Sequence, residues 1–563
     1  MYYICERPCV GSFRSCIDLV YDIVIKNGTV IDGTGEQRYT ADIAISEGKI
    51  VKIDRQMKEK PLEIIDASDH IVCPGFIDIH SHSDMALPFG NRLESTIHQG
   101  ITTTVIGNCG FSLAPVNEDR IDLIKKEFEI HSPPGESIDI TWRTFAEYLD
   151  TIEHAKISSN IASLVGFGAI RIAGGPAYDD RPPTDSEKEM MRYYVTEAME
   201  AGAFGMSTGL IYPPQVYATT GEIVALAEVV AEYKGLYFSH IRGEGETVLE
   251  AVKEVIEIVE RSGCVGGQIA HHKVAGRHLW GLSKQTLHLI HEANKRGISV
   301  TCDQYPYDRG STSLISLLPP WVHVGGVNEL LCRLRSPEAC EKIRAAMENT
   351  KSDWENIRVE AGWDNIFIAS VKTEKWKDIE GLNLSEITKL KGYSDTYAAL
   401  FELLLDENAE VTMTMKSMGD EDIERIMKSE YVMVGTDGGG VAPEGVLSHG
   451  KPHPRHYGTY PRILGRYVRK KGILTLENAI YKMSGFPAKR LGLTDRGNLQ
   501  EGNWADIVIF NPETILDNAT YLEPHQFPTG IPHVIVNGTI VVKEGIQGEE
   551  LPGMVLRKSN SLH

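Results

Sequence analysis

The 563-residue chain lacks an excess of basic residues, a long apolar run and paired cysteine motifs. Its 57 Lys and Arg face 78 Asp and Glu, a net charge of −21, which argues against nucleic acid or an anionic membrane surface as a partner. No stretch reaches the roughly 18 apolar residues of a membrane-spanning helix, and the N-terminus lacks the apolar core of a signal peptide. Nine cysteines without a CxxC pair are typical of reduced thiols. We therefore expect a cytoplasmic protein.

Alternating apolar and polar residues near both ends of the chain predict short strands. Residues 22–26 and 29–31 flank Asn27-Gly28, a pair that favours a hairpin turn. The same pattern returns at 505–510 and 533–542, where the second segment contains Asn537-Gly538. We expect residues 20–74 and 485–550 to pair into one small β-sandwich. Residues 1–19, with Cys5, Cys9 and Cys16, form an N-terminal extension in this prediction.

Between the two ends, apolar runs of strand length alternate with helix-like stretches. The eight runs cover residues 75–80, 102–107, 161–166, 203–207, 235–239, 267–270, 299–302 and 431–435. Helical periodicity fills most of the intervals, as at 183–201 and 221–233. The pattern predicts an α/β protein in which residues 75–484 form a (β/α)8 TIM-like barrel. The interval before the last strand is too long for one crossover, so residues 325–430 are predicted to form an inserted subdomain.

The first of these runs ends in two histidines, His80 and His82. Alternate side chains of a strand point to the same face, so the two imidazoles should project together from the strand end. Barrel enzymes take their catalytic groups from the C-terminal ends of the strands. Other thiol, imidazole and carboxylate groups, the ligand types of Zn²⁺, follow further predicted strands: Cys109, His240, His271 and Asp437. Their joint placement predicts a metal site.

These residues resemble the ligand set of the amidohydrolase superfamily. Within it, several segments are similar to the N-acyl-D-amino-acid deacylases (D-aminoacylases): Gly107-Asn108-Cys109-Gly110-Phe111-Ser112, Gly209-Leu210-Ile211-Tyr212-Pro213-Pro214, Ser239-His240, His271-His272-Lys273, Tyr305-Pro306-Tyr307, Gly310-Ser311-Thr312 and His453-Pro454-Arg455. Residues 484–488 and 502–506 are typical of the superfamily as a whole. The resemblance spans residues 20–545 and rests on the order and spacing of the motifs together.

The resemblance implies a zinc enzyme with one tightly bound ion and a second, weaker site. The tight site would consist of Cys109, His240 and His271, and the weaker site of His80, His82, Cys109 and Asp437. In this family a cysteine replaces the carboxylated lysine that bridges two metals in hydantoinases and dihydroorotases. The predicted fourth strand contains no lysine, in agreement with that pattern. One departure is Phe167, where relatives often carry a histidine.

The activity implied by the resemblance is hydrolysis of N-acyl-D-amino acids to a carboxylate and a free D-amino acid. Asp437 would serve as general base and then general acid. Side chains suited to hold the substrate's α-carboxylate or to donate hydroxyl hydrogen bonds are Arg455, Lys273, Tyr305, Tyr212 and Ser311. Acid-specific relatives place an arginine after the Ser311 position, but no basic residue occurs between Ser311 and Trp321. We therefore expect apolar side chains to be preferred over D-Glu or D-Asp.

Three alternatives remain at this stage. The same ligands would suit a cyclic-amide hydrolase of the dihydroorotase or hydantoinase type, or a metal-dependent deaminase. Such deaminases usually have His-x-x-Glu after the fifth strand, whereas Glu244 follows His240 by four positions. A catalytically silent scaffold is the third alternative, although every ligand position is filled. The expected partner is a small-molecule N-acyl amino acid, and the sequence leaves the oligomeric state open, a homo-oligomer included.

Overall fold

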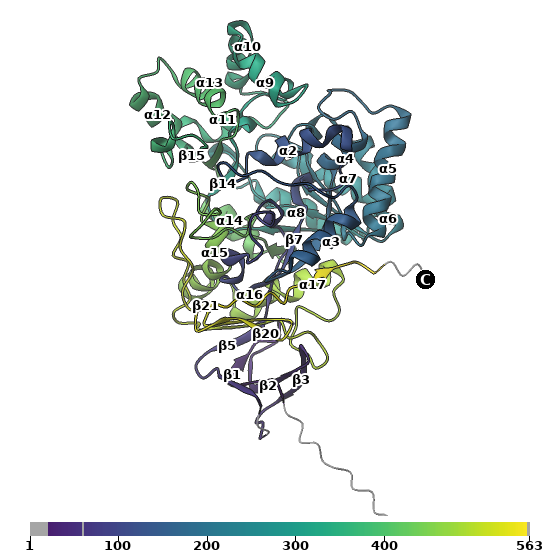
Figure 1. Ribbon diagram of the computed structural model, residues 1–563, viewed down its shortest axis with the longest axis vertical. Coiled ribbons are helices and arrows are strands. Elements are labelled where there is room, and N and C mark those ends of the chain that lie inside the picture. The colour runs from purple at the N-terminus through teal and green to yellow at the C-terminus, as the bar shows by residue number, and fades with distance from the viewer. Residues whose placement is uncertain (1–20, 59–60, 560–563) are drawn as a thin grey trace, which may run out of the picture.

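A computed structural model describes residues 21–58 and 61–559 of the chain. The predicted N-terminal extension, residues 1–19 with its three cysteines, lies outside the described residues. Figure 1 shows three parts along the longest axis: a β-sheet at one end, an α/β barrel in the middle and a largely helical subdomain at the other end. Within the described part of the chain, no helix combines the length and the apolar character needed to cross a membrane.

The sheet at one end is built from both ends of the chain. Its nine strands are β1 (Ile23–Val30), β2 (Tyr39–Ser46), β3 (Lys49–Asp54), β4 (Glu63–Asp66), β5 (Ile71–Pro74), β18 (Ile507–Phe510), β19 (His533–Val536), β20 (Thr539–Lys543) and β21 (Ile546–Gln547). The two ends meet where β5 pairs antiparallel with β18, with Pro74 opposite Ile507. Every residue of both strands is buried, so apolar side chains cover this seam on both faces.

One sequence-based expectation about this sheet is wrong. Asn27-Gly28 was expected to form a hairpin turn, but β1 continues through it as a bulge, with Asn27 at a φ of 63°. A bulge bends and twists a strand locally. β2 pairs with β1 on both sides of the bulge, whereas the other edge of β1 pairs with β4 in its first half and with β5 at Thr29 and Val30. The other such pair, Asn537-Gly538, does form the turn between β19 and β20.

The central barrel contains a strand in each of the eight predicted runs. In chain order they are β6 (Phe76–Asp78), β7 (Ile101–Ile106), β8 with β9 (Asn160–Ser163 and Val165–Gly166), β10 (Gly205–Gly209), β11 (Leu236–His240), β12 (Gly266–Ile269), β13 (Val300–Gln304) and β17 (Val432–Val434). Neighbours pair in parallel in this order, and β22 (Val555–Leu556) adds to β8 from outside. A parallel bridge between Ser81 and Gly438 joins the last strand to the first. The ring closes at the strand ends that carry the site.

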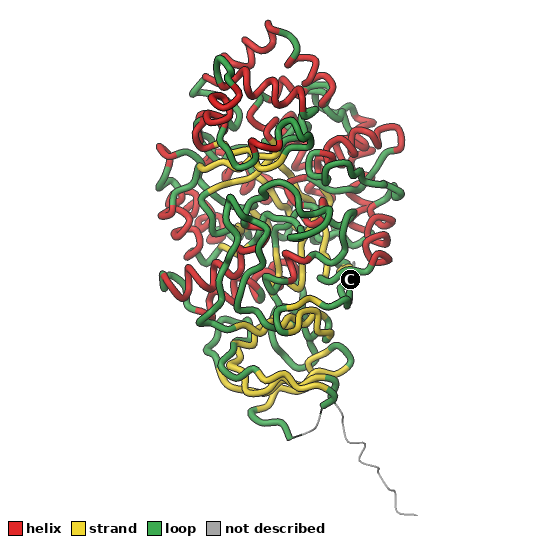
Figure 2. Tube along the Cα trace, turned by 60° about the vertical axis from the view of Figure 1, so that its left-hand side comes forward, coloured by secondary structure: helices red, strands yellow, loops and turns green. Residues whose placement is uncertain are grey.

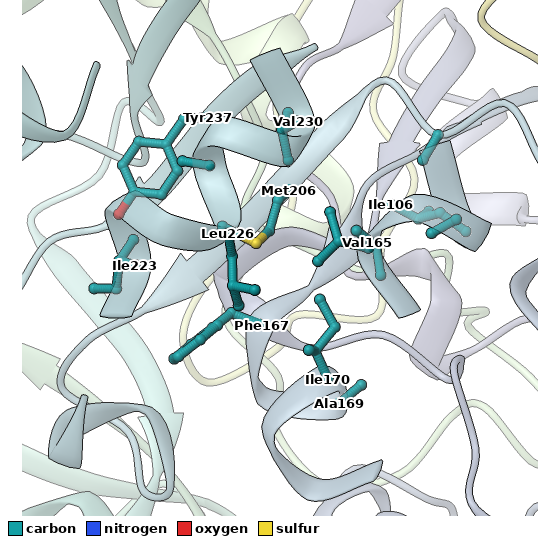
Figure 3. Packing of buried hydrophobic residues seen from close by; sticks show 14 of the residues in the cluster. Ile106, Val165, Phe167, Ala169, Ile170, Met206, Ile223, Leu226, Val230 and Tyr237 are labelled. Atoms are coloured by element: carbon teal, nitrogen blue, oxygen red, sulfur yellow. The ribbon is translucent and has the colours of Figure 1, made fainter. Parts of the chain in front are cut away.

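Helices surround the strands of the barrel (Figure 2). They are α1 (Glu94–Ile97), α2 (Ile121–Glu129), α3 (Phe145–Ala155), α4 (Phe167–Gly174), α5 (Asp185–Glu200), α6 (Thr220–Glu232), α7 (Val248–Ser262), α8 (Ser283–Lys295), α14 (Asp420–Lys428), α15 (Arg455–Arg462), α16 (Leu476–Met483) and α17 (Gly485–Leu491). Capping boxes at Thr144 and Thr184 begin α3 and α5. Figure 3 shows the core between strands and helices, in which Phe167 packs among aliphatic side chains such as Ile170 and Leu226.

The helical subdomain interrupts the barrel between β13 and α14. It contains β14 (Arg309–Ser313), α9 (Val327–Leu334), α10 (Pro337–Glu348), α11 (Ile357–Ala361), β15 (Ile366–Ser370), α12 (Leu384–Lys391), α13 (Thr396–Asp406) and β16 (Thr412–Lys416). The three strands form a separate antiparallel sheet, and the subdomain has its own apolar core. This sheet begins at Arg309, ahead of the predicted start near residue 325. The domain boundaries remain a prediction, but β14 lies against the mouth of the barrel and brings Ser311 to the site.

Candidate functional site

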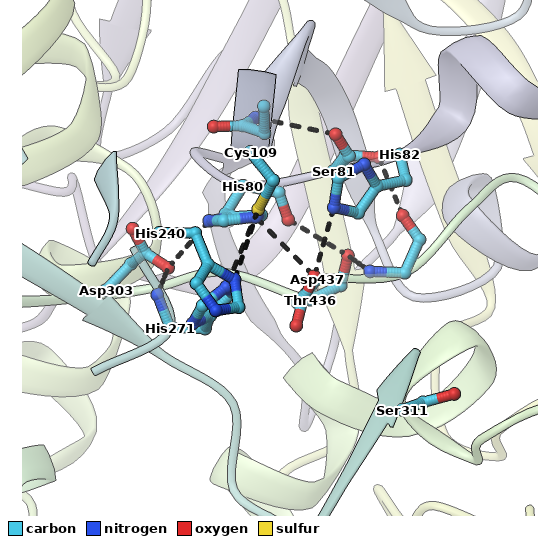
Figure 4. Close-up of polar contacts among 12 residues, drawn as sticks. His80, Ser81, His82, Cys109, His240, His271, Asp303, Ser311, Thr436 and Asp437 are labelled. Carbon is cyan, nitrogen blue, oxygen red and sulfur yellow. Dashed lines mark hydrogen bonds and ion pairs between the residues drawn. The ribbon is translucent and has the colours of Figure 1, made fainter. Parts of the chain in front are cut away.

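The predicted ligand residues lie together at the C-terminal end of the barrel (Figure 4). His80 and His82 follow β6, Cys109 follows β7, His240 ends β11, His271 follows β12 and Asp437 follows β17. The Sγ atom of Cys109 lies 3.4 Å from His80 Nε2, 3.5 Å from His271 Nε2 and 3.9 Å from His240 Nδ1. His82 Nε2 lies 3.2 Å from the carboxylate of Asp437. Apart from the edge of His82, these side chains are nearly inaccessible to solvent.

Three of these ligand residues adopt a left-handed backbone conformation. The φ angles are 53° at Cys109, 34° at His271 and 50° at Asp437. Side chains other than glycine rarely adopt this region, and such strain gathers at functional sites. Close packing fixes the Cys109 turn, because a Cβ on the preceding Gly107 would lie 2.0 Å from the carbonyl oxygen of Leu164. The thiol therefore points inward from a turn that has no room to relax.

Hydrogen bonds from the first strand fix Asp437. The carboxylate of Asp78 accepts from the backbone N–H of Thr436 at 2.9 Å and from its hydroxyl at 2.5 Å. The N–H of Asp437 donates to the carbonyl oxygen of His80 at 2.8 Å. Burial raises the pKa of Asp78 to about 7 against the hydrogen bonds that lower it. The first and last barrel strands thus fix the Asp437 carboxylate in position relative to His80 and His82.

Two groups of ligand atoms are close enough to hold metal ions. His80, Cys109, His271 and Asp437 form one group, and His240, Glu244 and His271 form the other, each with all ligand atoms within 4.8 Å. Burial raises the pKa of the Cys109 thiol, but His80 and His271 outweigh burial and bring that pKa well below its usual value. A thiolate is the form that binds a metal. The buried Nε2 of His240 has no hydrogen-bond partner among the described residues, so the residues present fit a zinc ion.

Two buried carboxylates that sequence reasoning did not assign complete the surroundings of the histidines. Asp303, in β13, lies 3.2 Å from His80 Nδ1 and accepts the backbone N–H of His271 at 2.7 Å. Glu244 lies 3.0 Å from His271 Nδ1 and 4.0 Å from His240 Nε2. Carboxylates in such positions orient metal-binding imidazoles and raise their basicity. The sequence could have indicated a role for Asp303, because a charged residue inside a buried strand is rare unless it has a partner.

The predicted substrate-binding residues line the same cavity, which has a volume of about 180 Å³. Arg455 Nη1 lies 2.7 Å from Asp437 Oδ2, and Lys273 Nζ lies 2.6 Å from Glu244. The ring of Tyr305 lies under both cations, 4.8 Å from the Arg455 guanidinium and 5.7 Å from Lys273 Nζ. Tyr305 OH has no hydrogen-bond partner among the described residues. Two cations and an available hydroxyl thus face one wall of the cavity.

The other two predicted substrate-binding residues, Tyr212 and Ser311, also line this cavity, and Arg455 donates to the carbonyl oxygen of Ser311 at 3.3 Å. The ring of Tyr212 is 4.9 Å from that of His240, and its hydroxyl accepts a hydrogen bond from Thr312 at 3.1 Å. Ser311 lies apart from the ligand residues in Figure 4 and donates its hydroxyl to the carbonyl oxygen of Met413 at 3.0 Å. Ser311 therefore lines the cavity with its hydroxyl proton already engaged.

Electrostatics set the state of Asp437. Burial alone raises the pKa of this carboxyl, but the Arg455 guanidinium and the histidines outweigh burial and hold the pKa well below its usual value. Asp437 is therefore ionised and able to accept a proton. The neighbouring Lys273 is also charged, because Glu244 raises its pKa against the effect of burial. Together the site offers an ionised carboxylate beside the predicted metal ligands, with two cations within the same cavity.

Comparisons with known proteins agree with this geometry. A model of the amidohydrolase family matches residues 63–297 and 432–542. The N-acyl-D-glutamate deacylase of Alcaligenes xylosoxydans xylosoxydans is 34% identical over 96% of this chain and 97% of its own length. The D-aminoacylase of the same organism is 33% identical over 96% of this chain and 98% of its own length.

Two solved structures are similar over almost the whole chain. The N-acyl-D-glutamate deacylase of Bordetella bronchiseptica, complexed with zinc and a phosphonate inhibitor, has a TM-score of 0.80 at 33% identity and covers 96% of this chain and 100% of its own. A D-aminoacylase with a binuclear metal centre has a TM-score of 0.78 at 30% identity with the same coverage.

Proposed function

Because this chain belongs to the amidohydrolase family and, within it, to the N-acyl-D-amino-acid deacylases, we propose that it hydrolyses N-acyl-D-amino acids to a carboxylate and a free D-amino acid. The observation that carries the proposal is the placement of Asp437 between ligand histidines and the Arg455 guanidinium, in one buried cavity. A deacylase needs that combination, since it must bind a metal, move a proton and hold a carboxylate.

Cys109, His240 and His271 would hold the tightly bound zinc ion, and His80, His82 and Asp437 would share Cys109 in a weaker second site. Bound there, zinc would supply Lewis acidity for the amide carbonyl and would lower the pKa of water to ~7. The carboxylate of Asp437 accepts the proton of the attacking water and then delivers it to the leaving nitrogen. Glu244 and Asp303 hold His271 and His80 in the orientation that metal binding requires.

Arg455, Lys273 and Tyr305 would bind the substrate's α-carboxylate. In this structure the Arg455 guanidinium lies against Asp437. A bound carboxylate would share that cation and so weaken its hold on Asp437, which moves the pKa of Asp437 upward, towards that of a more effective base. Binding of the correct substrate thereby prepares the proton acceptor.

We also propose that apolar side chains are preferred over acidic ones. Lys273 and Arg455 are the lysine and arginine side chains that line the cavity among the described residues. Both would be used by the α-carboxylate, so a second carboxylate on the substrate would have no cation of its own. Several apolar side chains line the rest of the cavity: Met85, Ile130, Ile211, Met415, Val441 and Leu447.

The test is a zinc-supplemented assay across N-acetyl-D- and N-acetyl-L-amino acids, with dihydrouracil and cytosine included. The expected result is cleavage of N-acetyl-D-leucine and N-acetyl-D-tryptophan, with little activity on the L-forms. Activity confined to the cyclic compounds would overturn the proposal and favour a cyclic-amide hydrolase or a deaminase. Faster turnover of N-acetyl-D-glutamate than of N-acetyl-D-leucine would contradict the side-chain preference alone.

A further inference from the structure

A second cavity of about 90 Å³ adjoins the reaction cavity. The two share Phe111, Ile130, His131, Tyr212 and Thr312 in their linings. Phe111 and Tyr212 are in ring contact at 5.2 Å, and behind them lie the rings of His82 and His240, at 6.4 and 4.9 Å. A single layer of aromatic side chains therefore separates the second cavity from the metal-ligand histidines. A substrate bound in the reaction cavity would reach the second cavity with a single extended substituent.

The unusual group in this second cavity is Glu127, on α2. Both of its carboxylate oxygens are buried, and neither has a hydrogen-bond partner within residues 21–58 and 61–559. Burial raises the pKa of this carboxyl to about 8. The neighbouring Lys126 donates to Glu129 at 3.0 Å, and Lys372 donates to the carbonyl oxygen of Glu129 at 3.0 Å. These two lysines thus donate to other groups, and neither Glu127 oxygen has a hydrogen-bond partner among the described residues.

The remaining lining narrows the chemistry of the missing partner. Apolar surfaces from Phe111, Ile130, Pro213, Ile315 and Val327 surround the carboxyl. A buried carboxylate without a partner is unfavourable, and a cationic nitrogen donor is its strongest complement. Glu129 and Glu410 also line the cavity, but they accept hydrogen bonds from Lys126 and Asn408. Apolar walls beside the one carboxylate without a partner, Glu127, fit a methylene chain that ends in an ammonium or guanidinium group.

We propose that this second cavity is a subsite for a positively charged nitrogen on the substrate, with Glu127 as its specificity-determining residue. The inference rests on the proposed deacylase function and extends it to a substrate class. The nitrogen has two possible sources, because a cationic chain can belong to the D-amino acid or to the acyl group. The first source is the side chain of D-lysine or D-arginine, and the second is an acyl chain that carries a terminal amine.

The experiment compares each cationic substrate with a neutral one of matched shape. One pair is N-acetyl-D-lysine and N-acetyl-D-norleucine, and the other is N-(6-aminohexanoyl)-D-leucine and N-hexanoyl-D-leucine. The kcat/KM ratio of each pair is measured for the wild type and Glu127→Gln, at a pH above the Glu127 pKa of about 8. A ratio within one protein cancels any loss of folded enzyme. Asp122→Asn, an exposed carboxylate on the same helix, is the matched control.

We expect the Glu127→Gln substitution to lower the cationic-to-neutral ratio roughly 10- to 150-fold in one pair, and Asp122→Asn to leave it unchanged. The substrate pair whose ratio falls shows whether the amino-acid side chain or the acyl chain enters the second cavity. Ratios unchanged by Glu127→Gln in both pairs would overturn the subsite, even if N-acetyl-D-leucine is hydrolysed. Absence of activity on every N-acyl amino acid would instead overturn the proposed function.

Discussion

Replacing Glu244 by glutamine removes a negative charge that faces both His271, a proposed metal ligand, and the buried Lys273. The Glu244 carboxylate lies 3.0 Å from His271 Nδ1 and 2.6 Å from Lys273 Nζ. All three side chains are buried. Burial lowers the pKa of Lys273, but the carboxylate more than offsets this and keeps the ammonium charged. The substitution therefore leaves a buried cation without its counter-charge and removes the carboxylate beside the His271 imidazole.

General magnitudes for such contacts give the size of the expected losses in folding free energy and in zinc affinity. Loss of one partner of a buried ion pair costs about 3–5 kcal/mol of folding free energy. Loss of a carboxylate behind a metal-bound histidine lowers metal affinity about 10- to 100-fold, or roughly 1.4–2.7 kcal/mol. We expect Glu244→Gln to lower the melting temperature of the metal-free protein and to weaken zinc binding within that range. A larger loss of affinity would indicate that Glu244 itself binds the metal.

Zinc affinity is measured by competition with a chromophoric chelator, and folding by thermal unfolding of the metal-free protein. Glu246→Gln is the matched control, because Glu246 pairs with His278 at the surface, with exposed fractions of 49% and 53%. Exposed pairs contribute about 0–1 kcal/mol, so the control should match the wild type in both measurements. A folded Glu244→Gln protein that binds zinc as tightly as the wild type would refute the role assigned to this carboxylate.

Three further predictions follow from the site and its surroundings. Arg455→Ala should lower kcat/KM for N-acetyl-D-leucine roughly 10- to 150-fold, the worth of a charge-assisted hydrogen bond; an unchanged value would remove Arg455 from carboxylate binding. Cys109→Ala should lose the tight zinc and activity together, whereas His82→Asn should retain one zinc and measurable activity; metal analysis and turnover of the two variants decide this. Burial raises the Glu127 pKa from 4.5 to about 8, so the folded state binds this proton more tightly than the unfolded state. Stability is then lost as the pH rises from about 4.5 to about 8. Over that pH window the Glu127→Gln protein should lose less folding free energy than the wild type, and the difference should be at most about 5 kcal/mol. Identical stability–pH curves for the variant and the wild type would be inconsistent with a buried Glu127 carboxyl.

Strand periodicity predicted much of the ligand set because its residues occupy strand ends. His80 and His82 share a face by simple alternation, and His240 is the last residue of β11. Cys109, His271 and Asp437 follow their strands in turns that no periodicity describes. Their assignment depended on motif resemblance, and the structure places them within reach of the same cavity.

The carboxylates behind the histidines could not be found in the same way. Glu244 lies in the loop after β11, and its role depends on Lys273, which comes from the loop after the next strand. The sequence spacing of Glu244 served only as an argument against a deaminase, because Glu244 is one position out of register with the deaminase motif. Glu127 is harder still, because a glutamate on an amphipathic helix is usually solvated. Its cavity is completed by residues of β14 and the start of α9 from the inserted subdomain, which are distant in sequence.

The pairing of β5 with β18 also sets an order of events during synthesis. About 430 residues separate Pro74 from Ile507, which lie opposite each other in the finished sheet. At the usual rate of translation, β5 leaves the ribosome roughly 20–90 s before its partner exists. During that interval β5 presents an open, apolar edge that another chain could join. The last strands of the protein therefore protect the exposed edge of β5 once they have been synthesised. A chain that ends before residue 507 would leave the β5 edge permanently unpaired.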